Sequence, residues 1–450
     1  MLLQELKGKN IAVWGLGREG MSNIELVLKH RLAAALYAYS DEICPPPAAY
    51  PQVRLFCGDE FEQMLDKVDV IIKSPGVSIY KEEVRRAKAR GIRFTTSSDI
   101  FLSEMRQNHP ETMVIGVTGS KGKSTTSSLL YTALKALGQD VAHCGNIGRP
   151  LVDLIDESHR FVVCELSSYQ CSDLSVSPQI VLFTNLFPEH VDWHLSHDNY
   201  YRDKVHLIAH QQPDDVCFVN ARCDKLKKYC GVYQRRFRYY NLPEGFAELN
   251  NVLCRNGKPL LQIEETLLQG YHNLDNMAGV LSVIDYLGLD VSTALESFKT
   301  FHALPHRLQK IGEKDGITFI NDSISTAPET AIAAIRSFDL PMGIFLGGYD
   351  RKQDYHELAR IINDTPQVKV VAVLFQTGPR IAETLKQVLT RRDIVLIEEP
   401  DFASAVKKVF ASLKRCGGRL ALFSPAAPSY DAYKSFEVRG EEFIKIFHNL

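Results

Sequence analysis

This 450-residue sequence lacks several features that mark membrane, secreted or nucleic-acid-binding proteins. It has no apolar run of membrane-spanning length, and its first residues, MLLQELKGKN, carry charges where a signal peptide needs an apolar core. The formal net charge is only −2, so no overall charge attracts nucleic acid or an anionic membrane. None of the ten cysteines forms a C-x-x-C pair, which argues against zinc. We therefore expect a cytoplasmic, reduced protein with no nucleic-acid partner and no membrane insertion.

The apolar segments that are present alternate with helical patterns and turns. Strands predicted at 11–14, 68–73 and 92–95 each run into a turn that contains glycine, serine or threonine. Strand, turn and helix in rotation are typical of a parallel, doubly wound sheet, so we expect an α/β fold. Further strands are predicted at 113–117, 161–165, 180–185, 317–321, 343–346, 368–375 and 419–423.

A chain of this length predicts about three domains. We place an N-terminal Rossmann-like domain at 1–103, a central parallel-sheet domain at 104–302 and a C-terminal Rossmann-like domain at 303–450. The polar stretch 104–111 is interpreted as the linker after the first domain.

The strongest motif is TGSKGKSTT at 118–126, directly after a predicted strand and before an amphipathic helix that Gly138 is expected to end. Its glycines let backbone N–H groups wrap phosphate oxygens, Lys123 neutralises charge, and the Ser124 hydroxyl can reach Mg²⁺. This pattern predicts an ATPase-like phosphate-binding loop in the central domain. The expected ATP-binding residues of the loop are Gly119, Ser120, Lys121, Gly122, Lys123, Ser124 and Thr125.

Two further side chains follow neighbouring predicted strands. Glu165 ends the strand at 161–165, and His190 comes after the next strand in the segment TNLFPEHVDWH. Because parallel strands deliver their carboxyl ends to one side of a sheet, we expect both side chains near the phosphate-binding loop. A carboxylate and an imidazole at that place could bind Mg²⁺.

The glycine spacing points to a family. Only two residues separate Gly119 from Gly122, and the segment GVTGSKGKSTT resembles the Mur ligase and folylpolyglutamate synthetase superfamily. The resemblance implies an ATP-dependent, amide-forming ligase that works through an acyl phosphate with two Mg²⁺ ions. It also implies that Lys204 is carbamylated by CO₂ and that the carbamate helps to hold a metal ion. The implied metal ligands are Ser124, Glu165, His190 and Lys204, and the implied catalytic residues are Lys123, Glu165, His190, Lys204 and His306.

Other segments match the same family in order along the chain. GNIG resembles a substrate-side loop and implies a role for Asn146, whereas YHNLDN implies that Asn273 and Asn276 approach the adenine. LPHR and NDS imply that Arg307 and Asp322 meet the nucleotide. Whether His190 or His306 orients or deprotonates a reacting group stays open.

The N-terminal motif GLGREG at 15–20, with Asp41 about twenty residues on, is by itself typical of dinucleotide binding. An NAD-dependent oxidoreductase is therefore one alternative, and a non-catalytic nucleotide-binding partner protein is another. The motif and the turn at 74–76 also resemble the MurD branch of the family, which implies binding of a UDP-sugar. The implied UDP-substrate residues are Gly17, Arg18, Glu19, Ser40, Asp41, Ser74, Pro75, Gly76 and Asn146.

The C-terminal segment SPAAPSYDAYKSFEVRG at 424–440 resembles the glutamate-binding stretch of the MurD branch. This implies a monomeric enzyme that adds glutamate, with D-glutamate favoured, to UDP-N-acetylmuramoyl-L-alanine in peptidoglycan synthesis. The implied glutamate-binding residues are Thr326, Arg351, Ser429 and Phe436. Ile324 stands where the branch usually has lysine, and Arg351 can replace a lysine that faces the substrate carboxylates. Addition of L-glutamate therefore stays open as an alternative.

Overall fold

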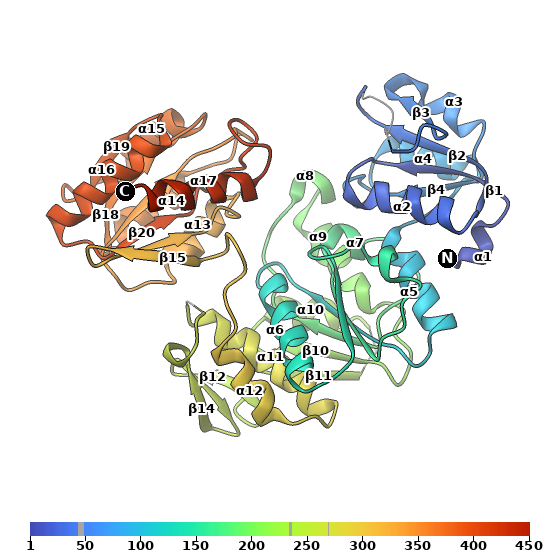
Figure 1. Ribbon diagram of the computed structural model, residues 1–450, viewed down its shortest axis with the longest axis horizontal. Helices are drawn as coiled ribbons and strands as arrows, with labels where there is room; N and C mark the ends of the chain where they lie inside the picture. The colour runs from blue at the N-terminus through green and yellow to red at the C-terminus, as the bar shows by residue number, and fades with distance from the viewer. Residues whose placement is uncertain (44–48, 234–235, 269) are drawn as a thin grey trace. The chain divides into compact units, whose positions relative to one another are not determined.

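The structure is a computed structural model that describes residues 1–43, 49–233, 236–268 and 270–450 (Figure 1). Cys44, one of the ten cysteines, lies outside the described residues. The chain forms two compact units, the first of Met1–Thr266 with Asn273–Phe301 and the second of Leu267–His272 with His302–Leu450. Every helix in the described part of the chain is too short or too polar to cross a lipid bilayer.

The first unit begins with a five-stranded parallel sheet of order β3-β2-β1-β4-β5. Its strands are β1 (Lys9–Trp14), β2 (Ala33–Ser40), β3 (Arg54–Cys57), β4 (Val70–Lys73) and β5 (Arg93–Thr95). Its helices are α1 (Leu3–Leu6), α2 (Arg18–Lys29), α3 (Phe61–Leu65), α4 (Glu82–Ala89) and α5 (Ser97–Asn108). Alternate residues of β1 face opposite cores, because Ile11 packs in the cluster that contains α2 and Ala12 packs in the cluster that contains α3 and α4.

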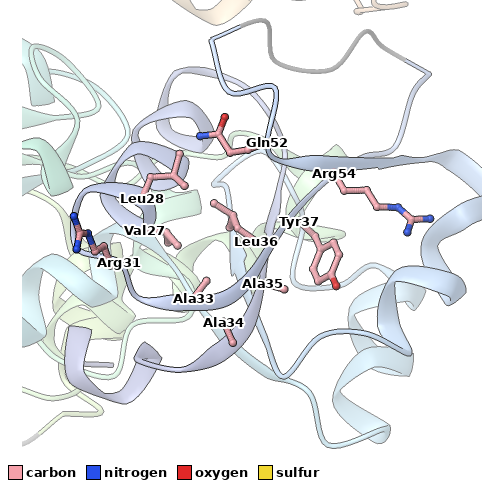
Figure 2. A pocket seen from close by; sticks show the side chains of 10 residues that line it. All are labelled: Val27, Leu28, Arg31, Ala33, Ala34, Ala35, Leu36, Tyr37, Gln52 and Arg54. Carbon is pink, nitrogen blue, oxygen red and sulfur yellow. The ribbon is translucent and has the colours of Figure 1, made fainter.

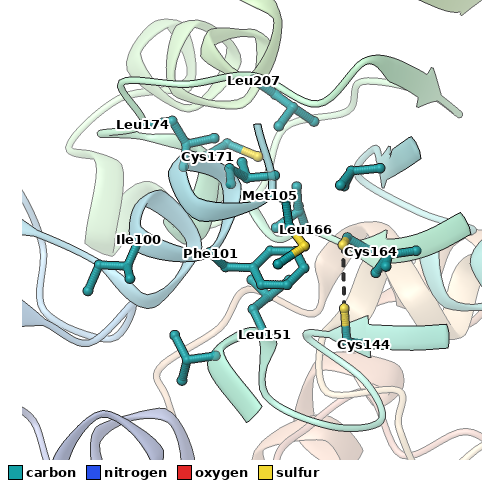
Figure 3. Close-up of a cluster of buried hydrophobic side chains, with 14 of the residues drawn as sticks. Ile100, Phe101, Met105, Cys144, Leu151, Cys164, Leu166, Cys171, Leu174 and Leu207 are labelled. Carbon is teal, nitrogen blue, oxygen red and sulfur yellow. Dashed lines mark hydrogen bonds between the residues drawn. The ribbon is translucent and has the colours of Figure 1, made fainter. Parts of the chain in front are cut away.

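The stretch predicted as a linker, 104–111, is helical up to Asn108, so that prediction is wrong for its first half. The polarity of this stretch misled the prediction, because Glu104 is buried and its carboxylate accepts hydrogen bonds from Leu3 N at 2.6 Å and Asn108 Nδ2 at 2.5 Å. The same helix buries Ile100, Phe101 and Met105 in a cluster with β7 and β8 side chains of the following domain (Figure 3).

The second sheet of this unit has six parallel strands in the order β11-β10-β9-β6-β8-β7. They are β6 (Met113–Thr118), β7 (Val141–Gly145), β8 (Phe161–Glu165), β9 (Ile180–Phe183), β10 (Val216–Asn220) and β11 (Arg236–Tyr240). A three-stranded antiparallel sheet follows, with β12 (Phe246–Leu249), β13 (Val252–Arg255) and β14 (Lys258–Gln262). The helices are α6 (Lys123–Ala136), α7 (Ser168–Cys171), α8 (Val191–His194), α9 (His197–Val205), α10 (Asp224–Cys230), α11 (His272–Tyr286) and α12 (Val291–Lys299).

The second unit contains a six-stranded sheet of order β15-β16-β20-β17-β18-β19, in which only the β15–β16 pair is antiparallel. The strands are β15 (Gln309–Lys314), β16 (Ile317–Asn321), β17 (Met342–Leu346), β18 (Val368–Val373), β19 (Val395–Glu398) and β20 (Leu420–Phe423). Helices α13 (Pro328–Ile335), α14 (His356–Asp364) and α15 (Gly378–Val388) pack in one core, and α16 (Phe402–Cys416) and α17 (Phe436–His448) pack in the other.

The α/β prediction, with Rossmann-like outer sheets and a parallel central sheet, is confirmed. Each predicted strand is present, with ends that differ by up to two residues. Gly138 follows α6 with φ +68°, as expected of a residue that ends a helix. The domain boundaries at 103 and 302 stay predictions.

A shallow pocket lies beside the first half of β2, away from the carboxyl ends of the strands (Figure 2). Its lining includes Leu28 and Arg31 near the end of α2, and Tyr37 and Arg54 on the sheet. The residues predicted to bind the UDP-sugar do not line this pocket.

The glycine turn after β1 makes a prediction about stability. A Cβ at Gly20 would lie 1.9 Å from the Gly15 carbonyl oxygen, whereas a Cβ at Gly17 would have no atom within 4 Å. We expect Gly20→Ala to lower the free energy of unfolding by about 1–3 kcal/mol, as overpacking does. Gly17→Ala is the matched control and should change it by less than about 0.5 kcal/mol. Urea unfolding of both variants measures this, and equal effects would contradict it.

Candidate active site

A glycine loop at 119–122 joins β6 to α6. Gly119 has φ +154°, and a Cβ added there would lie 1.9 Å from Thr184 Oγ1. Gly122 is the N-cap of α6 with φ +79°, and its Cβ would lie 2.7 Å from Asn276 Oδ1. Both positions therefore require glycine, and the predicted sequence of strand, loop and helix is confirmed.

The loop places polar groups around the first turn of α6. Lys123 Nζ donates to the Ser120 carbonyl oxygen at 2.8 Å, so the ammonium folds back over the loop. The Ser120 hydroxyl lies 2.7 Å from the Tyr200 hydroxyl, which anchors the loop from α9. Ser124 and Thr125 are buried at the start of the helix. Backbone N–H groups at a helix N-terminus, together with a lysine, are suited to phosphate.

Glu165 lies at the end of β8, opposite Val117 of β6. The side chain is fully buried, and its Oε1 atom accepts a hydrogen bond from Asn146 Nδ2 at 2.8 Å. Its Oε2 atom is also buried and has no hydrogen-bond partner within the described chain. A buried carboxylate oxygen without a partner is costly, and a cation would relieve that cost.

Lys204 of α9 is buried at the same edge of the sheet, with Nζ 3.4 Å from Thr118 Oγ1. Burial and then the charge of Lys123 lower the pKa of Lys204 to about 7, against the opposite effect of nearby carboxylates that include Glu165. Near neutral pH the side chain is therefore partly an uncharged amine, which can act as a nucleophile.

His190 adopts a left-handed backbone conformation, with φ +53°, at the N-cap of α8. Partial burial, followed by the charges of Lys204 and Lys123, lowers the pKa of His190 to about 4, so the ring is neutral near pH 7. A neutral imidazole can bind a metal ion.

The sequence analysis missed Glu189, which forms an ion pair with Lys121 of the glycine loop. Burial alone would raise the pKa of Glu189, but Lys121 and Lys123 outweigh it and lower that pKa. Glu189 directly precedes the predicted site residue His190, and this position could have indicated that Glu189 also lies at the site.

Two asparagines of α11 lie near the loop. Asn276 Nδ2 donates to Asn273 Oδ1 at 3.0 Å, and both side chains are buried. Since Asn276 also lies against Gly122, the structure brings this predicted pair to the phosphate loop.

The predicted UDP-substrate residues gather at the carboxyl end of the N-terminal sheet, except Asn146, which follows β7 of the second sheet. The Ser74 hydroxyl donates to the Gly15 carbonyl at 2.8 Å, which joins the turns after β1 and β4. Asp41, which with Ser40 marks the end of β2, forms an ion pair of 2.9 Å with Lys81, a residue the sequence analysis missed. Gly76, which follows Pro75, accepts a hydrogen bond from Trp193 Nε1 at 3.1 Å.

The remaining predicted residues belong to the second unit. Asp322 accepts hydrogen bonds from Ser424 Oγ at 2.8 Å and from Leu308 N at 3.2 Å, directly after Arg307. His306 is buried, with Nδ1 3.0 Å from Asn321 Nδ2, and burial lowers its pKa.

Three of the predicted glutamate-binding residues lie on loops that are bonded to one another, whereas the fourth, Phe436, begins α17. Gln353 Nε2 donates to the Thr326 carbonyl at 3.1 Å, and Tyr349 N donates to the Pro428 carbonyl at 2.8 Å, next to Ser429. The structure thus links the loops that carry Thr326, Arg351 and Ser429.

Arg351 is exposed, and its guanidinium lies 5.9 Å from the centre of the Tyr430 ring. Asp350 pairs with Arg380 at 2.5 Å instead, which leaves the Arg351 charge available to an anion. Lys352 is also exposed, with φ +58°.

Arg439 of α17 was missed as well. It is fully buried and donates to the carbonyls of Ser323, Ala427 and Pro428 at 2.7–3.0 Å and to the Ser323 hydroxyl at 3.1 Å. That hydroxyl in turn donates to the Phe436 carbonyl at 2.8 Å. Burial lowers the pKa of Arg439 to about 10, so it stays charged near neutral pH and fixes these loops.

The parallel central sheet and its glycine loop define a nucleotide-binding α/β enzyme. Residues 117–284 match the family model described as Mur ligase middle domain, and residues 9–96 match the model Mur ligase MurD-like, N-terminal domain. The chain is 35% identical to the UDP-N-acetylmuramoyl-L-alanine--L-glutamate ligase of Xanthomonas campestris pv. campestris, over 99% of this chain and 96% of that protein. A protein of the same name from Salinispora tropica is 34% identical, with 98% of each chain covered. The chain belongs to the Mur ligase family, whose members are ATP-dependent, amide-forming ligases.

Solved structures agree on the fold. The chain matches MurC, the UDP-N-acetylmuramate-alanine ligase of Thermotoga maritima, with a TM-score of 0.58, 17% identity and coverage of 98% of this chain and 99% of that one. It matches the ADP complex of MurF ligase from Thermotoga maritima with a TM-score of 0.58, 18% identity and coverage of 99% and 96%. The oxidoreductase alternative gains no support from these comparisons.

The loop geometry predicts that Lys123→Ala abolishes ATP turnover with little change in melting temperature, because the Lys123 ammonium folds back over the loop, where it can meet phosphate. Lys135→Ala, in the last turn of the same helix and exposed, is the control and should keep normal turnover. Phosphate release and thermal melting measure both effects. Near-normal phosphate release by Lys123→Ala would remove the ATP-site assignment.

Proposed function

We propose that this enzyme uses ATP to join L-glutamate to UDP-N-acetylmuramoyl-L-alanine in peptidoglycan precursor synthesis. The observation that carries the proposal is 35% identity across 99% of the chain to a relative whose name states this reaction. That name favours the L-glutamate alternative over the D-glutamate expectation of the sequence analysis. Ile324 and Arg351, which depart from the MurD pattern, lie in segments we assign to glutamate handling. The proposal includes a monomer that acts in the cytoplasm, where ATP and UDP-sugars are available.

The proposed chemistry has two steps. The alanine carboxylate of the UDP-sugar attacks the γ-phosphorus of ATP, which gives an acyl phosphate and ADP. The glutamate amine then attacks the acyl carbon, and phosphate leaves as the amide forms. Lys123 and the N–H groups of the glycine loop neutralise the charge of the transferred phosphoryl group, where most catalysis of such transfers lies. Asn273, Asn276, Arg307 and Asp322 are assigned to the nucleotide.

Mg²⁺ fits this site, because Glu165 holds a buried carboxylate oxygen without a hydrogen-bond partner in the described chain. Carboxylate and hydroxyl oxygens are suitable ligands for this hard cation. We assign Glu165, Ser124, His190 and carbamylated Lys204 to the two ions. When bound, Mg²⁺ would neutralise phosphate charge during transfer.

The buried Lys204 amine supports the carbamate assignment. The neutral amine attacks CO₂, a C–N bond forms, and the departing proton leaves a carbamate anion. Because the pKa of Lys204 is about 7, the reactive neutral form grows as the pH rises from 6 to 8. Burial favours the neutral amine, and carbamylation then supplies oxygen ligands that an ammonium cannot.

Lys204→Ala should therefore lose nearly all activity, and acetate should restore part of it by placing a carboxylate in the vacated space. Acetate should leave Lys123→Ala inactive, which controls for general salt effects. Phosphate release with and without acetate is the measurement. A Lys204→Ala enzyme that retains most of its activity would show that no carbamate is needed.

The C-terminal loops predict how glutamate is held. A charge-assisted hydrogen bond is worth about 1.5–3 kcal/mol, so Arg351→Ala should raise the glutamate KM roughly ten- to a hundredfold with little change in the ATP KM. Arg351→Lys should recover only part of the lost glutamate affinity, since an ammonium is a point charge and cannot make the paired hydrogen bonds of a planar guanidinium. Lys352→Ala is the neighbouring control and should be milder. Steady-state kinetics measure these KM values. A larger rise of the glutamate KM in Lys352→Ala than in Arg351→Ala would assign the carboxylate contact to Lys352 instead.

The function itself is tested by phosphate release on UDP-N-acetylmuramoyl-L-alanine with L- and D-glutamate in parallel. We expect release that requires ATP, the UDP-sugar and L-glutamate together, and the amide product in mass spectra. A clear preference for D-glutamate would overturn the stereochemical part alone. No release with either isomer would overturn the substrate assignment.

A further inference from the structure

The side chain of Arg18, in the N-terminal glycine turn, is bonded to the central domain. Its Nη1 atom donates to the Gly148 carbonyl at 3.1 Å, and its Nη2 atom donates to the carbonyls of Gly145 and Asn146 at 3.3 and 3.1 Å. All three acceptors lie at or just after the end of β7. The guanidinium thus spans the backbone of the GNIG loop.

That loop holds the buried carboxylate of the proposed metal site. The Asn146 backbone N–H donates to the Glu165 carbonyl at 2.9 Å, and the Asn146 side chain donates to Glu165 Oε1 at 2.8 Å. Gly145 packs so closely on this strand that its Cβ would lie 2.2 Å from the Glu165 carbonyl oxygen. Any movement of the loop therefore moves the donor that orients Glu165.

The next residue of the turn, Glu19, is linked to the segment that follows Glu165. Gln170 Nε2 donates to Glu19 Oε1 at 2.8 Å, and Gln170 Oε1 accepts from the Ser167 backbone N–H at 2.9 Å. Ser167 lies two residues after Glu165 in the chain. Burial raises the pKa of Glu19, as expected for a carboxyl enclosed between two domains.

We propose that Arg18 is a positioning residue that sets the orientation of the Glu165 carboxylate through Asn146, while Glu19 supports the segment after Glu165 through Gln170. This inference rests on the proposed function, in which Glu165 holds Mg²⁺. It gives the N-terminal turn a task besides binding the UDP-sugar: the substrate-binding domain supports the metal-binding carboxylate. Three hydrogen bonds from the Arg18 guanidinium to carbonyl oxygens hold this loop.

The test measures ADP affinity by calorimetry with and without Mg²⁺, in the absence of any UDP-sugar, so direct substrate contact cannot contribute. Arg18→Ala should weaken Mg²⁺-dependent ADP binding about tenfold and leave metal-free ADP binding unchanged. Arg18→Lys, whose shorter side chain ends in a single ammonium group, should fall between this variant and the wild type. Arg86→Ala removes an exposed arginine that pairs with Glu62 in the same domain, and it should match the wild type.

Hydrogen exchange of the intact protein gives a second readout. The amides of the loop at 145–149 should exchange faster in Arg18→Ala than in Arg86→Ala, because the carbonyls that hold the loop lose their donors. If Arg18→Ala has the same amide exchange and the same Mg²⁺-dependent ADP affinity as the wild type but a higher KM for the UDP-sugar, the inference is overturned. Arg18 is then a substrate contact. If the ADP affinity of the wild-type protein is the same with and without Mg²⁺, the proposed metal site is overturned, and this inference with it.

Discussion

The site depends on one buried carboxylate, that of Glu165. One of its oxygens has no hydrogen-bond partner within the described chain. Glu165 is enclosed at the end of β8, where an unpaired negative charge would cost several kcal/mol in a medium of low dielectric constant. Asn146 satisfies one oxygen, and the cationic glycine loop follows the neighbouring strand β6. Burial also drives Lys204 toward its neutral form, so the edge of the sheet does not collect unbalanced charge. The proposed metal site and the proposed carbamylation of Lys204 both rest on this arrangement.

The sequence predicted those parts of the site that depend on local geometry. The spacing of Gly119 and Gly122, a strand before them and a helix after them were sufficient to predict the phosphate loop, because only glycine fits both backbone positions. The positions of Glu165 and His190 followed from the rule that parallel strands share one carboxyl edge. The MurD-branch resemblance also indicated the loops of the second unit that carry Arg351 and Ser429.

Features that arise from contacts between distant segments could not be predicted in this way. Arg439 has the sequence signature of a surface helix residue, yet it is buried by carbonyls more than ten and more than one hundred residues away. Glu104 appeared to belong to a polar linker, whereas its partner Leu3 lies about a hundred residues earlier in the chain. Polarity alone does not reveal exposure when the hydrogen-bond partner is remote.

The chain contains two tryptophans, and their surroundings differ. Trp14 is fully buried against Tyr39, within the core of the N-terminal sheet. Trp193 stacks on Tyr169, and its indole N–H donates to the Gly76 carbonyl in the turn after β4. The second indole therefore reports on the hydrogen bond between that turn and α8. The wild-type enzyme thus carries an intrinsic fluorescence probe, with no label needed, for events that alter this contact.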